Sequence, residues 1–358
     1  MFSRFLKRGK SLNLFVADFI NSFNLFTMAD INVKYLGLDL RTPLIAASSG
    51  LTDNIDNLKR FEKHGAGAVV LKSIFEEEIR IEKDASLSKM SSSGFIYPES
   101  MEFYDYHDGA DNESTFRYLD LIREAKKKLS IPVIPSINCV TAEQWTDYPR
   151  LIQEAGADAL ELNIFIIPSD LTRTKFDNEK IYFDIVNEVK KQVTIPISLK
   201  VSFYFSDLAL MLKRLSETGI AGLVLFNRFY SPDFDIDNME VTSASVLSSP
   251  GDFSPSLRWI AIMKNHVSCD LASSGGVHDG NTMIKMILAG ANAVQVASAF
   301  YKNGIDYGDE LINVLQAWMK KNKYKNINEF RSLMSQQETE NPAVFQRVQF
   351  MKYFRGQR

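Results

Sequence analysis

Eight short apolar runs recur along the chain, and each ends in a polar or glycine-containing cluster. The runs span residues 43–49, 68–73, 131–138, 159–163, 195–202, 222–227, 269–276 and 293–298. Between them, apolar residues stand three and four apart, which is the spacing of an amphipathic helix. Buried strands that alternate with helices form parallel sheets, so the pattern predicts an α/β fold, a (β/α)₈ TIM barrel.

The length of 358 residues suits one such barrel with long loops, because a barrel takes about 250 residues before insertions. We expect a single domain over residues 28–358, in which residues 32–42 form a hairpin at the bottom of the barrel. Residues 74–117 and 228–253 are connections too long for plain loops, and such connections are often lids or substrate walls. Helical spacing near the carboxyl end predicts outer helices over residues 310–321, 327–334 and 342–353.

Charge and cysteine content narrow the class of protein. The formal net charge of −3 gives no reason to expect nucleic acid as a partner. Cys139 and Cys269 both fall in predicted strands, so we expect no disulfide framework and a cytoplasmic location. The four histidines show no metal-ligand spacing, so no metal site is expected.

Residues 1–27 differ in character from the rest of the chain. Basic residues precede apolar ones at helical spacing, which fits an amphipathic helix that contacts a membrane or caps the barrel. The alternative is an extension upstream of a natural start at Met28, and the sharp change of character there favours the extension.

Polar residues stand at the carboxyl ends of the predicted strands, where a barrel of this type builds its active site. They are Lys72-Ser73, Asn138, Asn163, Lys200, Asn227 and Ser274-Gly275-Gly276. A lysine buried without a partner would be costly, and an anionic ligand would supply that partner. The two lysines and three amides therefore indicate a site for a polar, anionic cofactor.

The turn at Gly275-Gly276 is the candidate phosphate site. A helix follows near Asp279, and bare amides at a helix start bind phosphate well. Ala297-Ser298, after the eighth strand, would form the other half of the cradle. A glycine pair alone is an ordinary turn, but barrels often bind phosphate after strands seven and eight, and that placement favours the phosphate site.

An ordered set of segments carries a family resemblance. The segments are Tyr35–Leu38, Thr42–Leu44, Ala47–Gly50, Gly65–Ser73, Leu160–Asn163, Leu199–Val201, Ser274–Val277, Ala289–Ala291 and Val294–Val296. From residue 32 to the carboxyl end the chain resembles the dihydroorotate dehydrogenases, which are FMN-containing (β/α)₈ barrels. The resemblance implies oxidation of dihydroorotate to orotate, in pyrimidine biosynthesis, by hydride transfer to the flavin. It also implies a small-molecule substrate and a homodimer.

The resemblance also implies roles for individual residues. Lys200 would lie near the N1/O2 edge of the flavin, where a cation stabilises negative charge. Lys72 would touch flavin and substrate, and Asn163 and Asn227 would contact the substrate. The residues implied to bind FMN are Ser48, Ser49, Gly50, Lys72, Ser73, Asn138, Asn163, Lys200, Gly275, Gly276, Ala297 and Ser298.

The substrate side departs from the family pattern. After the fourth strand the family carries a cysteine or serine that acts as the base, but this chain has Ile166 and Ile167. Ser169 and Asp170 are the candidate replacements, and partial burial of Asp170 would raise its pKa as a base requires. The family's substrate loop is replaced by residues 95–103, which are bulkier and acidic.

These departures leave alternatives open. One is an FMN oxidoreductase for another small cyclic substrate, and another is a flavin-binding relative without catalysis. From a different class, a non-redox isomerase or lyase would bind a phosphorylated metabolite at Gly275-Gly276. The chain has no cysteine cluster for an iron–sulfur centre. The electron acceptor stays open among fumarate, NAD through a partner subunit, and quinone.

Overall fold

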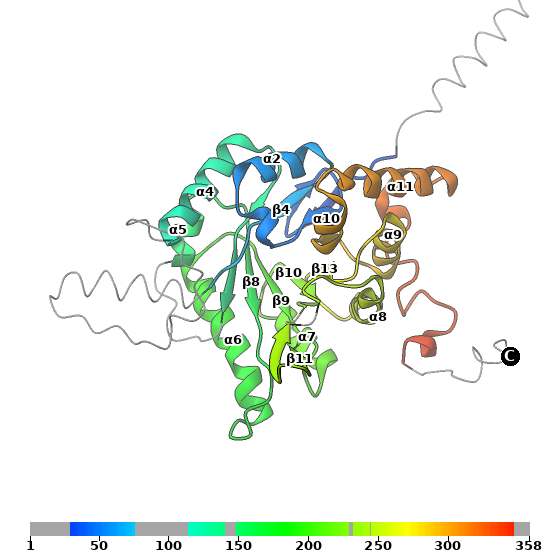
Figure 1. The fold of residues 1–358 in the computed structure, drawn as a ribbon. Coiled ribbons are helices and arrows are strands. Elements are labelled where there is room, and N and C mark those ends of the chain that lie inside the picture. The colour runs from blue at the N-terminus through cyan, green and yellow to red at the C-terminus, as the bar shows by residue number, and fades with distance from the viewer. Residues whose placement is uncertain (1–28, 76–113, 140–147, 229–231, 244, 347–358) are drawn as a thin grey trace, which may run out of the picture.

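A curled parallel sheet lies at the centre of the molecule, with helices around its outside (Figure 1). The computed structural model describes residues 29–75, 114–139, 148–228, 232–243 and 245–346. The strands of the sheet are β3 (Leu44–Ala46), β4 (Ala68–Val70), β5 (Ile74–Phe75), β6 (Val133–Ile134), β7 (Ser136–Cys139), β8 (Leu160–Ile164), β9 (Ile197–Val201), β10 (Gly222–Leu225), β13 (Asp270–Ser274) and β14 (Ala293–Val296).

The strand order shows that the sheet closes on itself. The order is β5-β7-β8-β9-β10-β13-β14-β3-β4-β6, and every pair is parallel. The short strands β6 and β7 are two parts of the third predicted run, divided at Pro135, which has no N–H for the ladder. The two ends of this order are β5 and β6. Because β5 pairs with β7 and β6 runs directly into β7, the two ends meet and the sheet closes. The predicted (β/α)₈ barrel is confirmed.

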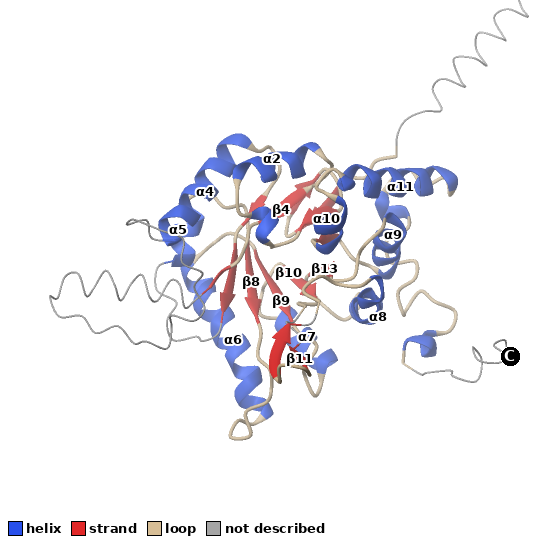
Figure 2. Ribbon diagram, viewed as in Figure 1, coloured by secondary structure: helices blue, strands red, loops and turns tan. Residues whose placement is uncertain are grey.

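Helices form the outer layer, and Figure 2 shows them surrounding the strands. Side chains cap several of their amino-terminal ends, as Asn54, Thr174, Asp207 and Asp279 do. Their apolar faces pack on the sheet, as Leu58 and Phe61 of α2 show. The helices are α2 (Ile55–Lys63), α4 (Ser114–Lys128), α5 (Tyr148–Glu154), α6 (Lys175–Gln192), α7 (Leu208–Ser216), α8 (Phe253–Met263), α9 (Gly280–Ala289), α10 (Ser298–Asn303) and α11 (Tyr307–Lys321).

The predicted hairpin covers the amino-terminal end of the barrel. It consists of β1 (Val33–Tyr35) and β2 (Leu38–Leu40). The backbone N–H of Leu36 donates to Asp270 Oδ2 over 2.8 Å, at the start of β13. A Cβ at Gly222, where β10 begins, would lie 2.5 Å from Leu36 Cδ2. The buried Leu36 thus closes the end opposite the candidate site.

Two predictions about the outer segments need correction. Beyond α11, the expected helix over residues 327–334 is wrong: only a 3₁₀ turn at Ile327–Glu329 forms, and Ser332 has a φ of 76°, which an α-helix does not accommodate. Pro342–Phe345 forms a second 3₁₀ turn, and residues 347–353 of the last expected helix lie outside the described residues. The connection over residues 228–253 contains an unpredicted hairpin, β11 (Pro232–Asp235) and β12 (Glu240–Ser243).

The described helices include none long and apolar enough to cross a bilayer. Residues 1–27 and their suggested membrane contact lie outside the described residues, as does the substrate loop over residues 95–103. Among the described residues, no group of histidine, cysteine, aspartate or glutamate side chains could hold a metal ion.

Candidate active site

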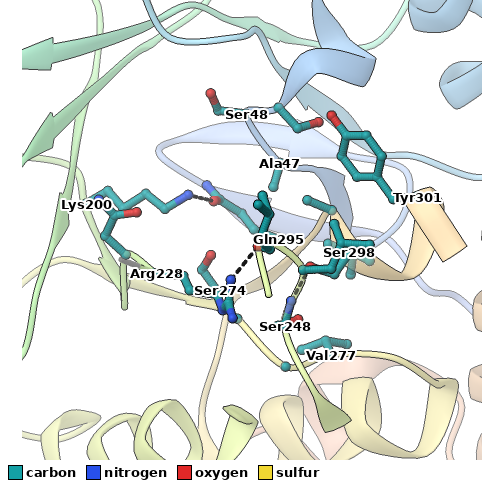
Figure 3. A pocket seen from close by; sticks show the side chains of 18 of the residues that line it. Ala47, Ser48, Lys200, Arg228, Ser248, Ser274, Val277, Gln295, Ser298 and Tyr301 are labelled. Atoms are coloured by element: carbon teal, nitrogen blue, oxygen red, sulfur yellow. Dashed lines mark hydrogen bonds between the residues drawn. The ribbon is translucent and has the colours of Figure 1, made fainter. Parts of the chain in front are cut away.

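A cavity of about 430 Å³ opens at the carboxyl ends of the strands (Figure 3). Its walls come from the ends of β3, β9, β13 and β14 and from the segment that follows β12. Most of the residues implied to bind FMN line it, namely Ser48, Ser49, Gly50, Lys200, Gly275, Gly276, Ala297 and Ser298. The substrate candidate Asn227 lines it as well.

The glycine turn forms one end of this cavity. Gly275 and Gly276 have φ values of 87° and 72°, which other residues rarely adopt. A Cβ at Gly276 would lie 2.1 Å from the backbone nitrogen of Phe253, whereas a Cβ at Gly275 would meet nothing within 4 Å. Ala297 and Ser298 line the same cavity. The glycine turn after β13 and the residues after β14 therefore border one space that an anionic group can enter.

Lys200 lies at the bottom of the cavity, with only 7% of its surface exposed. Its Nζ donates to Gln295 Oε1 over 3.1 Å, and Figure 3 shows the two side chains pointing toward each other. Gln295 Nε2 donates in turn to Glu161 Oε2 over 2.5 Å. Glu161 Oε1 is 3.8 Å from Lys200 Nζ. A buried cation and a buried anion therefore share one amide beneath the cavity.

Three serine hydroxyls support another wall. Ser48 lines the cavity and accepts from the backbone N–H of Ser73 over 2.9 Å. The Ser73 hydroxyl lies 3.0 Å from the Ser48 hydroxyl and 2.8 Å from that of buried Ser136. Hydrogen bonds from Ser73 thus hold the Ser48 side chain in place, although Ser73 itself does not line the main cavity.

The three predicted asparagines gather on one side of the barrel mouth. Asn138 and Asn163 are register partners on β7 and β8, so their side chains point to the same face. Asn163 is likewise paired with Lys200 on β9. Asn227 Nδ2 donates to Asn163 Oδ1 over 2.8 Å. Of the three, only Asn227 is among the residues that line the main cavity.

Lys72 lies apart from Lys200. Its exposed side chain lines a separate cavity of about 290 Å³ together with Asp53, Arg117 and Tyr118. The structure therefore brings one of the two predicted lysines into the main cavity. The expected contact of Lys72 with flavin and substrate stays a prediction.

The candidate bases lie on an exposed segment after β8. Ser169 and Asp170 are both exposed, and neither lines the main cavity. Asp170 accepts from the hydroxyl and the backbone N–H of Thr172, over 2.6 and 2.9 Å. These hydrogen bonds lower the pKa of Asp170, so the expected partial burial and raised pKa are wrong. A catalytic role for either residue stays a prediction.

Residues 245–248, here called the strap, close one side of the cavity. They belong to the connection over residues 228–253, which the sequence marked as a candidate lid or substrate wall, but the sequence did not predict the contacts that hold them. Two hydrogen bonds from the Arg228 guanidinium hold the strap in place. They go to the carbonyl of Ser245, over 2.8 Å, and to the carbonyl of Val246. The backbone N–H of Ser248 donates to the Ser298 hydroxyl over 2.9 Å. No local pattern marks these contacts. The polar Gln295 inside an apolar strand was a signal that sequence analysis could have used.

FMN is a flat, polar ring system that carries a phosphate, and the residues present fit it. The glycine turn carries no side chain, and the position that a Cβ at Gly275 would take has nothing within 4 Å, which leaves room for a phosphate beside the backbone. Lys200 presents a cation that has only an amide and a distant carboxylate for partners among the described residues. The cavity joins these two features.

Comparison with known proteins adds independent information. Residues 30–319 match the model of a family described as dihydroorotate dehydrogenase. The chain is 28% identical over 310 residues to a Thermoplasma acidophilum protein named dihydroorotate dehydrogenase B (NAD(+)), catalytic subunit, which covers 84% of this chain and 98% of that protein. A Methanocaldococcus jannaschii protein of the same name is 25% identical over 297 residues, covering 81% of this chain and 94% of that protein.

Proposed function

This chain belongs to the dihydroorotate dehydrogenase family, and we propose that it is an FMN-dependent member that oxidises dihydroorotate to orotate in pyrimidine biosynthesis. Family membership makes it an oxidoreductase that acts on CH–CH bonds. One observation carries the choice of FMN: a single cavity joins the bare Gly275-Gly276 turn to the buried ammonium of Lys200.

Each part of the site has a proposed task. When bound, FMN supplies a hydride acceptor. The backbone of Gly275, Gly276, Ala297 and Ser298 holds the phosphate, and Ser48, Ser49 and Gly50 line the flavin. Lys200 presents positive charge where negative charge develops in the cavity. Of the remaining residues implied to bind FMN, we propose that Lys72, Ser73, Asn138 and Asn163 contact or support it.

The substrate lies against the amides in this proposal. Asn163 and Asn227, which are hydrogen-bonded to each other, orient it, and Lys72 contacts its anionic edge. Ser169 or Asp170 removes the proton that leaves with the hydride. The lowered pKa of Asp170 makes it a weaker base than an ordinary aspartate. Ser169 is preferred because the resemblance implies a cysteine or serine as the base, and its hydroxyl passes its own proton to solvent as it takes the proton of the substrate.

A second candidate is oxidation or reduction of another small cyclic substrate at the same flavin. Aromatic side chains favour it, because Phe203, Tyr204 and Phe226 line a cavity of about 290 Å³ that shares Asn227 and Arg228 with the main one. The ring centroids of Phe203 and Tyr204 are 4.8 Å apart, and both residues are more than a third exposed. Such faces suit a flat, weakly charged ring.

The relatives' name, catalytic subunit, implies a partner subunit in those proteins. We propose the same for this chain: a homodimer that passes electrons to a partner and thence to NAD. The free thiol of Cys269 is in keeping with the reducing cytosol proposed for it.

Flavin analysis of the purified protein tests the proposal. We expect flavin absorbance, release of FMN on denaturation, and anaerobic bleaching when dihydroorotate is added. A colourless protein that takes up no added FMN contradicts both flavin candidates and favours the non-redox barrel. A yellow protein that dihydroorotate does not bleach, but another cyclic amide does, selects the second candidate. A yellow protein that none of the tested amides bleaches indicates a flavin-binding relative without this catalysis.

A further inference from the structure

We propose that Glu161 is a positioning residue, which holds the Lys200 ammonium in place and offsets its charge, and thereby sets how readily FMN in this cavity is reduced. The inference rests on the proposed binding of FMN. It concerns a buried carboxylate for which the proposed reaction has no direct use.

Glu161 lies one layer deeper in the barrel than the residues that line the cavity. It precedes Asn163 by two residues on β8, so both side chains share a face of the strand. Only 1% of Glu161 is exposed, and it does not line the cavity, whereas Lys200 and Gln295 do. Glu161 can therefore influence a bound flavin only through space or through these two neighbours.

The hydrogen bonds connect Glu161 to Lys200 through one amide. Gln295 accepts from Lys200 Nζ with its oxygen and donates to Glu161 Oε2 with its nitrogen. This arrangement fixes the orientation of the amide, because each end has one chemical role. The strands that carry Glu161 and Gln295, β8 and β14, are not neighbours, so the contact spans the barrel interior.

One carboxylate oxygen is left without a hydrogen bond. Glu161 Oε1 accepts none from the described residues, although it is fully buried. Among the described residues, the cation nearest to it is Lys200 Nζ, at 3.8 Å. A buried charge without full pairing destabilises a fold, so the carboxylate is an unfavourable choice for packing alone. The effect that remains for the Glu161 carboxylate is electrostatic, because it places a negative charge beside the cation that faces the cofactor cavity.

The sign of that effect follows from charge. Reduction of the flavin adds electrons, and a nearby cation favours the negatively charged product. Lys200 therefore favours reduction and Glu161 opposes it, across a medium that screens charge less than water does. Replacing Glu161 with a neutral side chain of the same shape should shift the equilibrium toward reduced FMN.

The test compares midpoint potentials of FMN bound to the wild-type protein and to Glu161→Gln. We expect the equilibrium constant for two-electron reduction to rise about tenfold, which is a shift of about +30 mV. Lys200→Gln should shift the potential in the opposite direction. Glu161→Asp keeps the charge and should stay near the wild type, which separates charge from shape.

An unchanged or lower potential in Glu161→Gln, with FMN still bound, overturns the inference. Binding of FMN to the apoproteins and their thermal unfolding are measured as well. If Glu161 had only a structural role, its replacement would change FMN binding and thermal stability but not the midpoint potential. If Glu161→Gln does not fold, the variant with both Glu161→Gln and Lys200→Gln replaces it, because replacing both members of a buried pair is tolerated better than replacing one. The midpoint potential of this double variant should exceed that of Lys200→Gln by the same amount. A wild-type protein that binds no FMN defeats the proposed function instead, and is recognised before any potential is measured.

Discussion

Asn227 Nδ2 donates to Asn163 Oδ1 over 2.8 Å, although strand β9 lies between β8, which carries Asn163, and β10, which ends two residues before Asn227. The contact occupies one acceptor and one donor of the pair. Within the described part of the chain, Asn227 Oδ1 and Asn163 Nδ2 keep their hydrogen-bonding capacity for a ligand. The pair therefore offers a donor and an acceptor side by side, which matches an amide or imide edge better than it matches a carboxylate.

Lys200→Ala should weaken FMN binding at least tenfold, because it removes the cation at the bottom of the cavity and leaves Glu161 buried without its charge partner. Fluorescence titration of the apoprotein with FMN measures the change. Lys213→Ala, on the outer helix α7, is the matched control and should bind as the wild type does. Wild-type flavin content and turnover in Lys200→Ala would defeat the assignment of Lys200.

Alanine substitutions at the glycine turn should differ in their cost. Gly275→Ala places a side chain at positive φ and should lower the free energy of unfolding by about 1–3 kcal/mol. Gly276→Ala carries the same strain and adds a clash with the backbone nitrogen of Phe253, so the loss should be larger. Urea unfolding of both variants gives the comparison. Equal losses would show that the close approach at Gly276 relaxes freely.

Ser169→Ala and Asp170→Asn separate the two candidate bases. We expect Ser169→Ala to slow dihydroorotate-dependent flavin reduction by about a hundredfold or more, the usual contribution of a general base. Asp170→Asn should slow it less than tenfold, because hydrogen bonds from Thr172 lower the pKa of Asp170 and weaken it as a base. Single-turnover bleaching of the bound flavin is the measurement. The reverse order would transfer the role to Asp170, and no effect of either change would remove both candidates.

Cys269 should resist alkylation in the folded protein. Burial, followed by the negative charge of Asp270, raises its pKa to about 12, so little thiolate exists near neutral pH. At about pH 8 its reaction with iodoacetamide should be on the order of a thousandfold slower than that of an ordinary cysteine. Because this pKa is raised on folding, the neutral thiol favours the folded state fully below the unfolded-state pKa, and this advantage is lost as the pH rises toward 12.

Peptide mass spectrometry resolves Cys269 from Cys139, and the urea-unfolded protein supplies the control rate. Equal rates in the folded and unfolded protein would show that the thiol is accessible and ionised, in conflict with its burial.

The repeating pattern of the sequence was sufficient to predict the barrel. Each of the eight runs contains all or most of at least one strand, because a parallel strand that is buried on both faces is mostly apolar. The glycine turn and Lys200 followed from the same register, since parallel strands end at one face. The hairpin at the bottom was predicted from Gly37 and Asp39, of which Gly37 lies in the turn with a φ of 76° and Asp39 lies in strand β2.

Other features depend on contacts between residues far apart in the sequence. The strap over residues 245–248 is placed by Arg228 and by Ser298 on another element, and no periodicity encodes such bonds. The separation of Lys72 from Lys200 also escaped prediction, because a strand end fixes where a residue stands but not which cavity its side chain enters.

The sequence alone determined the fold class, the face that carries the site and the residue types there, because periodicity and strand length are local properties of the chain. Only the tertiary structure decided which side chains meet. It joined Lys200 to Glu161 through Gln295 across the barrel, and it left Asp170 exposed with a lowered pKa. The charge and hydrogen bonds around a group are set by neighbours brought close by folding, and these neighbours settle its chemistry.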